Sequence, residues 1–128
     1  PRAPGGTESI LLVEDQADVR HLAAYALHSY GYNVTSASTA VEALARFEET
    51  SGSFDLLLTD IVMPGLSGRE LADRLLEQCP GLKVLFMSGY TGDIVMRHGV
   101  DGEDSAFIEK PFTPDQLAAR VRAVLNPV

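Results

Sequence analysis

Residues 56–60 read Leu-Leu-Leu-Thr-Asp, a short apolar run that ends in a carboxylate. Three other runs share its length and its apolar character, at 10–13, 84–87 and 106–108. None of them alternates apolar with polar residues, which is the pattern of parallel β-strands that helices cover on both faces. A fifth, more polar run at 32–36 suits a strand at the edge of a sheet.

Segments with helical periodicity separate these runs. Apolar residues recur with i, i+3, i+4 and i+7 spacing at Val19, Leu22, Ala23, Ala26, Leu27 and Tyr30; at Ala40, Ala43, Leu44 and Phe47; at Leu71, Leu75 and Leu76; and at Leu117, Val121, Val124 and Leu125. Capping-box spacing marks helix starts at Thr39, Ser67 and Thr113. The helix after Ser88 has the weakest pattern, because several glycines interrupt it. Strand and helix thus alternate five times, which predicts an α/β, three-layer (βα)5 sandwich around a five-stranded parallel sheet.

Composition limits the class of protein. The 128 residues are enough for one domain, and 45% of them are apolar, which suffices for a packed core. A formal net charge of −8 disfavours binding to nucleic acid or to an anionic membrane surface. The single cysteine, Cys79, cannot form an internal disulfide, which fits the reducing cytoplasm. Residues 1–7 are rich in proline and glycine and are expected to be a linker, with the domain at 8–126.

Polar side chains with chemical potential stand where the predicted strands end. Glu14 and Asp15 follow the first strand, Asp60 ends the third, Ser88 ends the fourth and Lys110 follows the fifth. In doubly wound sheets, ligands bind at the carboxyl ends of the strands, near the topological switch point. We therefore expect three carboxylates, one hydroxyl and one ammonium group to meet in one site.

The residue types in this site suit phosphoryl transfer. Three neighbouring carboxylates repel one another, and a hard divalent cation such as Mg²⁺ relieves that repulsion. A lysine ammonium suits a phosphoryl oxygen, and an aspartate can attack phosphorus to form an aspartyl phosphate. Taken singly, a strand-end aspartate is usually a helix cap or a solvated residue. The joint placement favours Mg²⁺-assisted transfer to Asp60.

Four motifs give the chain a resemblance to a known family. They are Leu12-Val13-Glu14-Asp15, Asp60-Ile61-Val62-Met63-Pro64-Gly65 with Gly68 following, Met87-Ser88-Gly89, and Lys110-Pro111-Phe112. In these motifs the chain resembles the receiver domain of two-component response regulators, over about residues 8–126. The resemblance implies a flavodoxin-like fold with strand order 2-1-3-4-5 and Mg²⁺ as cofactor. It also implies that a histidine kinase or a histidine phosphotransfer domain donates the phosphoryl group.

The resemblance assigns a role to each residue of the acidic site. Asp60 is the phosphoacceptor and a metal ligand, Asp15 is a direct Mg²⁺ ligand, and Glu14 acts on the metal mainly through water. The backbone carbonyl of Val62 completes the protein ligands. The side chains of Val62 and Tyr90 are expected to flank the water that hydrolyses the aspartyl phosphate, and their character predicts slow hydrolysis.

Further residues are implied to sense the phosphoryl group. Ser88 and Lys110 contact it once it is attached, and Phe107 stands where the family has an aromatic switch residue, commonly a tyrosine. The peptide bond between Lys110 and Pro111 is expected to be cis. The face formed by the fourth helix, the fifth strand and the fifth helix is expected to change on phosphorylation and to provide a homodimer contact.

Other classes of function fit the sequence less well. A phosphatase with an aspartate nucleophile would need a second carboxylate two residues after Asp60, where Val62 stands. A flavodoxin-like cofactor binder would need a phosphate-binding loop where Glu14 and Asp15 stand, and a pseudo-receiver would lack Asp60 or Lys110. As an enzyme, the domain is expected to catalyse only its own phosphorylation and dephosphorylation.

The parent protein is a separate question. Three segments, at 6–15, 86–92 and 109–113, are similar to the receiver domains that end bacterial hybrid sensor histidine kinases. We expect the chain to be such a domain in a phosphorelay, cytoplasmic and without membrane contact of its own, in a parent that is itself a membrane-anchored histidine kinase. The alternative is a stand-alone single-domain response regulator.

Overall fold

The computed structural model describes residues 5–89 and 106–125. Its elements are β1 (Ser9–Val13), α1 (Ala17–Ser29), β2 (Asn33–Ala37), α2 (Ala40–Glu49), β3 (Leu56–Asp60), α3 (Gly68–Gln78), β4 (Lys83–Ser88), β5 (Phe107–Glu109) and α5 (Pro114–Leu125). The strands form one parallel sheet in the order β2-β1-β3-β4-β5. This confirms the predicted flavodoxin-like α/β sandwich and the edge position of the polar strand. The helix predicted after Ser88 lies outside the described residues.

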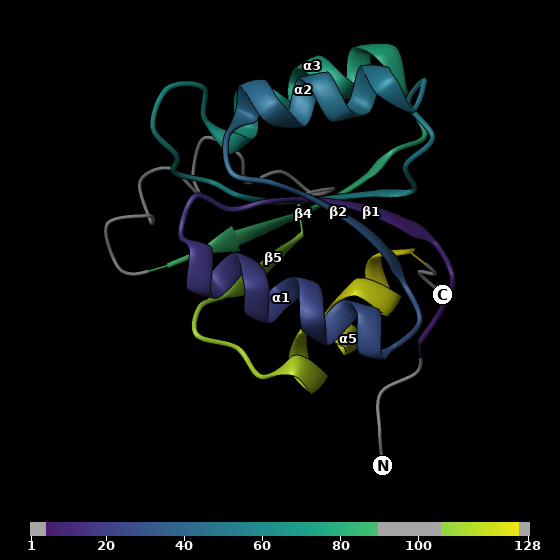
Figure 1. Ribbon diagram of the computed structural model, residues 1–128, viewed down its shortest axis with the longest axis vertical. Coiled ribbons are helices and arrows are strands. Elements are labelled where there is room, and N and C mark those ends of the chain that lie inside the picture. Colours follow the sequence, from purple (N-terminus) through teal and green to yellow (C-terminus); the bar gives the residue numbers. More distant parts are fainter. Residues whose placement is uncertain (1–4, 90–105, 126–128) are drawn as a thin grey trace.

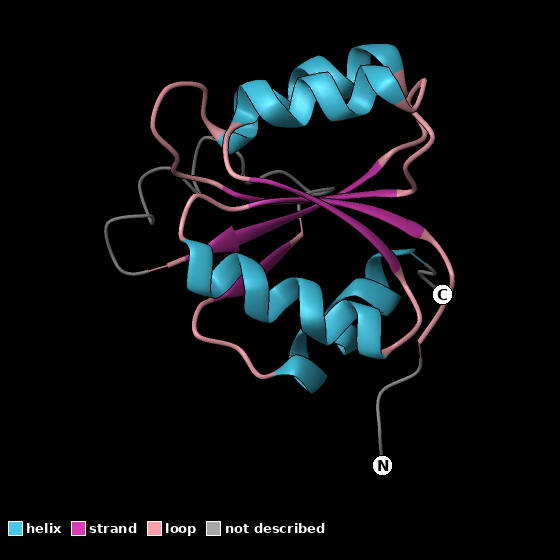
Figure 2. Ribbon diagram, in the orientation of Figure 1, coloured by secondary structure: helices cyan, strands magenta, loops and turns pink. Residues whose placement is uncertain are grey.

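The described helices form two layers around the sheet. α2 and α3 cover one face, and α1 and α5 pack together on the other (Figure 1). Figure 2 shows the strands as a twisted layer between the two helical layers. Among the described residues, no helix has the length and apolar character needed to cross a membrane.

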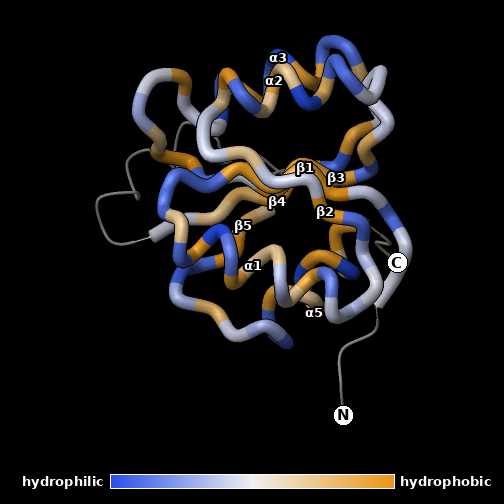
Figure 3. Tube along the Cα trace, viewed as in Figure 1, coloured by the Kyte–Doolittle hydropathy of each residue, from blue (hydrophilic) through white to orange (hydrophobic). Residues whose placement is uncertain are grey.

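Each face of the sheet has its own apolar core. Leu11, Val13 and Leu57 pack into the core beneath α2 and α3, whereas Ile10 and Leu12 pack into the core beneath α1 and α5. Alternate residues of a strand point to opposite faces, so a strand between two helical layers is apolar at every position. This explains why the strand sequences do not alternate, and Figure 3 shows the resulting apolar band along the sheet.

Each predicted capping residue stands at the start of a helix and hydrogen-bonds to its first turn. At α3, the Glu70 N–H donates to Ser67 Oγ and the Ser67 N–H donates to the Glu70 carboxylate, both at 3.2 Å. Thr113 and Gln116 form the same reciprocal pair at the start of α5. The Thr39 side chain caps α2. Each cap satisfies backbone donors that have no partner inside the helix.

The start of α3 lies directly against the end of β3. The Gly68 N–H donates to the Ile61 carbonyl at 2.9 Å. A Cβ atom at position 68 would lie 2.0 Å from the carbonyl oxygen of Asp60, so only glycine allows this approach. Asp60 also pairs in register with Met87 of β4. The end of β3 is therefore fixed from two sides.

Residues 5–7, which were expected to be a linker, contact the domain. The Gly6 N–H donates to the Tyr30 carbonyl at 3.1 Å, and Asn33 Nδ2 donates to the Thr7 carbonyl at 2.9 Å. The segment thus packs on the turn between α1 and β2. The domain boundary at residue 8 stays a prediction.

Candidate functional site

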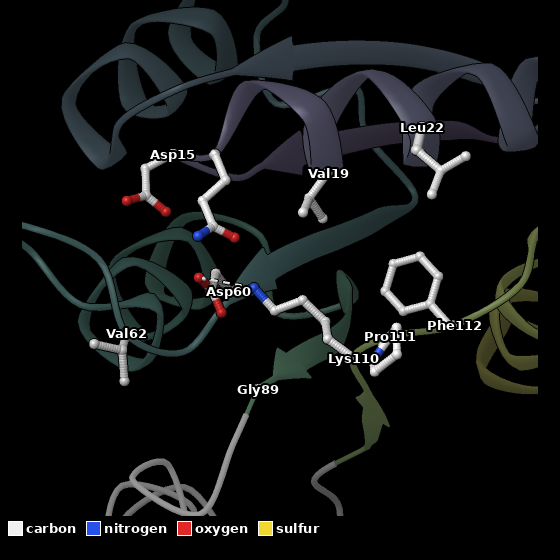
Figure 4. Close-up of a pocket in the computed structure, with 10 residues that line it drawn as sticks. Asp15, Val19, Leu22, Asp60, Val62, Gly89, Lys110, Pro111 and Phe112 are labelled. Atoms are coloured by element: carbon white, nitrogen blue, oxygen red, sulfur yellow. Dashed lines mark ion pairs between the residues drawn. The ribbon is translucent and has the colours of Figure 1, made fainter.

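A pocket of about 460 Å³ lies at the carboxyl edge of the sheet (Figure 4). It is lined by Asp15, Gln16, Val19, Leu22, Asp60, Val62, Gly89, Lys110, Pro111 and Phe112. These residues come from the loop after β1, from α1, from the ends of β3 and β4, and from the loop after β5. This is the position expected for a ligand site in a doubly wound sheet.

An acidic cluster forms one side of the pocket. One carboxylate oxygen each of Glu14, Asp15 and Asp60 lie within 4.8 Å of one another. Glu14 is fully buried and Asp60 is 6% exposed, whereas Asp15 is exposed. Burial, reinforced by the charge of Glu14, raises the pKa of Asp60 to about 7. Burial also raises the pKa of Glu14. The negative charge of the cluster is therefore poorly compensated, and a bound cation would stabilise it.

Lys110 is the cation that faces this cluster. Its Nζ donates to Glu14 Oε1 at 3.0 Å and lies 3.3 Å from Asp60 Oδ2. Burial alone would lower the pKa of Lys110, but the hydrogen bond to Glu14 and the charge of Asp60 outweigh it and raise that pKa. One ammonium group faces three carboxylates, so two negative charges are left when all of these groups are ionised.

The donor set fits a hard divalent cation. All three side chains of the cluster offer carboxylate oxygens, and no sulfur or imidazole ligand belongs to it among the described residues. Mg²⁺ prefers oxygen ligands and keeps several waters, which suits a cluster with an exposed member such as Asp15. The excess negative charge next to Lys110 also favours the binding of a cation.

Of the residues expected to sense a phosphoryl group, Lys110 lines the pocket and Ser88 directly precedes Gly89, which also lines it, whereas Phe107 is not among the lining residues. Ser88 Oγ is buried and has no hydrogen-bond partner among the described residues. The Lys110 N–H donates to the Ser88 carbonyl at 2.8 Å, and the bond from Lys110 to Pro111 is cis as expected. The Phe107 ring is half-buried, with its centroid 5.8 Å from that of Phe86.

Val62 and Tyr90 are the residues expected to flank the hydrolytic water. The Val62 side chain lines the pocket and is 46% exposed. Tyr90 lies outside the described residues. Of the predicted site, the structure therefore brings Glu14, Asp15, Asp60 and Lys110 together and places Val62 at the rim.

Two features of the site were not predicted from the sequence. Val19 and Leu22 of α1 and Phe112 form an apolar wall on the side of Lys110 away from Asp15 (Figure 4). Arg20 Nη1 donates to the backbone carbonyl of Glu14 at 2.8 Å. Periodicity placed Val19 and Leu22 on an apolar helix face but could not show that this face reaches the pocket. No pattern distinguishes Arg20 from a solvated helical arginine.

Comparison with known proteins gives consistent matches along the chain. Residues 10–122 match the family described as the response regulator receiver domain. The chain is 37% identical to the response regulator receiver protein CpdR of Brucella abortus, over 91% of this chain and 95% of that protein. It is 39% identical to the sensor kinase CckA of the same organism over 94% of this chain, but it spans only 13% of that protein.

Solved structures show the same likeness. The crystal structure of a response regulator receiver domain protein from Clostridium thermocellum has a TM-score of 0.83 at 27% identity, covering 93% of this chain and 94% of that chain. The chemotaxis protein CheY4 of Vibrio cholerae has a TM-score of 0.80 at 25% identity, with 93% and 99% covered.

Proposed function

Because the chain belongs to the response regulator receiver family of two-component signalling, we propose that it is a switch whose phosphoacceptor is Asp60. One observation carries the proposal. The Asp60 carboxylate ends the central strand β3, lies 3.3 Å from the Lys110 ammonium and adjoins two further carboxylates. A nucleophile, a countercharge and ligands for a cation are thus within reach of one phosphoryl group.

The proposed reaction is transfer from a phosphohistidine. A carboxylate oxygen of Asp60 attacks phosphorus, and the bond from phosphorus to the imidazole nitrogen breaks with its electron pair left on the ring. The pKa of Asp60, raised to about 7, would leave much of this nucleophile protonated near neutral pH. Mg²⁺, when bound, favours the ionised carboxylate and offsets the charge on the phosphoryl oxygens. Lys110 pairs with one of those oxygens.

The proposed metal ligands divide into two kinds. Asp15 and Asp60 hold Mg²⁺ directly, together with the backbone carbonyl of Val62. Both carboxylate oxygens of Glu14 already accept hydrogen bonds, one from Lys110 at 3.0 Å and one from the backbone N–H two residues further on at 3.1 Å. This supports an action of Glu14 through water rather than by direct ligation.

The proposed response starts at Ser88. Its buried hydroxyl has no hydrogen-bond partner among the described residues, and a phosphoryl group on Asp60 would give it an acceptor. The Lys110 N–H donates a hydrogen bond to the Ser88 carbonyl, which would link a shift of Ser88 to β5, the strand that carries Phe107. We propose that Phe107 then changes rotamer and alters the face of β5, α5 and the helix predicted before β5. A homodimer contact is proposed on that face.

The apolar wall of the pocket supports a protein as the phosphoryl donor. Leu22 is 46% exposed, and with Val19, Pro111 and Phe112 it lines the pocket beside Lys110. A phosphoryl group and Mg²⁺ need no such wall, but the helices around a phosphohistidine would bury it. We propose that a histidine kinase or a histidine phosphotransfer domain docks here.

The proposal for the parent protein rests on the relatives that the chain matches. The match to the sensor kinase CckA supports a hybrid histidine kinase in a cytoplasmic phosphorelay, with a receiver domain at residues 8–126. The match to CpdR over 95% of that protein supports the alternative of a stand-alone response regulator.

Intact-mass spectrometry with acetyl phosphate tests the proposed function. In Mg²⁺ the chain should gain one phosphoryl group, and in excess chelator it should gain none. Asp15→Asn should abolish both Mg²⁺ binding and labelling, whereas Asp18→Asn, an equal charge change at an exposed position of α1, should preserve both. Full labelling in chelator, or in Asp15→Asn, would exclude the proposed metal site.

A further inference from the structure

Glu14 connects the acidic cluster to its surroundings through several contacts. It is fully buried, it follows the last residue of β1, and it precedes the exposed Asp15. Its N–H donates to the Ala37 carbonyl of β2 at 3.1 Å. Its carboxylate accepts from Lys110 Nζ at 3.0 Å and from the Gln16 N–H at 3.1 Å. None of these contacts involves the backbone carbonyl of Glu14.

Arg20 holds that carbonyl. Arg20 lies in the first turns of α1, where its N–H donates to the Gln16 carbonyl at 2.9 Å. Its half-buried side chain turns back along the helix, so that Nη1 donates to the Glu14 carbonyl at 2.8 Å. Helix α1 thus closes the loop at residues 14–16 with one backbone bond and one side-chain bond. A charged donor makes the second bond stronger than a neutral one.

We propose that Arg20 is a positioning residue of the metal site. By holding the Glu14 carbonyl, it fixes the peptide between Glu14 and Asp15 and so sets the direction of both carboxylates relative to Asp60. Arg20 touches neither the metal ligands' carboxylates nor the acceptor in the described contacts. The inference rests on the proposed function, since it concerns the Mg²⁺ affinity of the same cluster.

Charge and position make opposite predictions for the loss of Arg20. Removing a cation from the neighbourhood of a cation site strengthens cation binding, because it removes repulsion. Removing a residue that orients the ligands weakens binding, and outer contacts of this kind typically change metal affinity by about 10- to 100-fold. The direction of the change in Mg²⁺ affinity therefore identifies which role Arg20 has.

Three variants separate these roles. Arg20→Met removes the hydrogen bond and the charge while it keeps most of the side-chain volume. Arg20→Lys keeps the charge and one donor, so it should restore part of the loss. Arg74→Met is the matched control, because Arg74 lies on an exposed position of α3, on the other face of the sheet.

The measurement is an NMR titration of each variant with Mg²⁺, combined with amide hydrogen exchange in metal-free buffer. We expect Arg20→Met to bind Mg²⁺ about tenfold more weakly than the parent, at the lower end of the range for such contacts. Arg20→Lys should fall between the two, and Arg74→Met should match the parent. The Gln16 amide, which donates to the Glu14 carboxylate, should exchange faster in Arg20→Met while core amides of β1 and β3 keep their protection.

Two results would overturn the inference. One is Mg²⁺ binding by Arg20→Met that equals or exceeds that of the parent, which would mean that Arg20 acts through charge or not at all. The other is an unchanged exchange rate at Gln16 in both Arg20 variants, which would mean that the loop keeps its geometry without the contact. If the parent itself binds no Mg²⁺, the proposed metal site is wrong, and the exchange at Gln16 decides the positioning role by itself.

Discussion

At the scale of single residues, the surroundings of Asp60 disfavour its ionised form. Its carboxylate is buried beside Glu14, and its pKa is raised to about 7 from the ordinary value of 3.8. Between these two values the folded chain holds a proton at Asp60 that the unfolded chain has lost. The contribution of Asp60 to stability is therefore largest at low pH and is lost as the pH rises through about 7.

Replacement of Asp60 by asparagine should remove this pH dependence. In metal-free buffer at pH 8, we expect Asp60→Asn to be more stable than the parent by about 2 kcal/mol. One pKa unit corresponds to about 1.4 kcal/mol, so the shift from 3.8 to about 7, which already includes the attraction of Lys110, sets an upper limit of about 4 kcal/mol on the gain. The difference should shrink toward pH 5 and on addition of Mg²⁺. Urea denaturation at both pH values measures it, and a less stable Asp60→Asn at pH 8 would contradict the assigned pKa shift.

Val62 provides a second test at the residue scale. Its exposed side chain lines the pocket and cannot orient a water molecule behind the phosphorus. Val62→Asn supplies such a group and should speed loss of the phosphoryl group severalfold, where a factor of ten is about 1.4 kcal/mol of barrier. Val41→Asn makes the same change at an exposed position of α2 that does not line the pocket.

The measurement is the decay of the phosphorylated chain in Mg²⁺ after the donor is removed. Val41→Asn should decay like the parent. If Val62→Asn also decays like the parent, water access past this side chain does not set the lifetime.

At the scale of elements, α1 contributes to the site in two ways. Its first turns hold the loop that carries the acidic residues, through Arg20. Its outer face adds Val19 and Leu22 to the apolar wall of the pocket. The same helix also packs against α5 beneath the sheet. A change on the exposed face can therefore be made without disturbing the buried face.

A charged residue on that face should slow phosphotransfer from a protein donor more than labelling by a small-molecule donor. We expect Leu22→Glu to slow phosphotransfer from a histidine phosphotransfer protein at least tenfold, because it places a carboxylate in a surface that the donor has to cover. Labelling by acetyl phosphate should change much less, since Leu22 lies in the apolar wall of the pocket and outside the acidic cluster that holds Asp60. Val41→Glu on α2 is the control. Equal rates from the protein donor for Leu22→Glu and the parent would place the docking surface elsewhere.

At the scale of the whole molecule, the sequence predicted the sheet well because its strands are buried on both faces. The runs at 10–13 and 56–58 are apolar for that reason, and the fold rule for parallel sheets then locates the site at the ends of these strands. The clustering of Asp60, Asp15 and Lys110 could be predicted because their motifs stand at strand ends. Contacts such as Arg20 to Glu14 could not, because the partner is a backbone carbonyl that any sequence offers.

The element order suits the proposed effect of the site on a distant face. Asp60 ends β3, Ser88 ends the neighbouring β4, and Phe107 begins β5 at the edge of the sheet. In the proposed response, a contact formed at Asp60 is passed through these neighbouring strands toward α5. The proposed response begins with phosphorylation of Asp60.

Borohydride trapping tests that central claim most directly. An acyl phosphate is reduced by borohydride to an alcohol, so an aspartyl phosphate becomes homoserine at the residue that held the phosphoryl group. After labelling with acetyl phosphate in Mg²⁺, peptide mass spectrometry should find homoserine at position 60, and the Asp60→Asn chain should yield none. Homoserine at position 15 or any other aspartate of the parent, or a labelled and folded Asp60→Asn chain, would contradict the account.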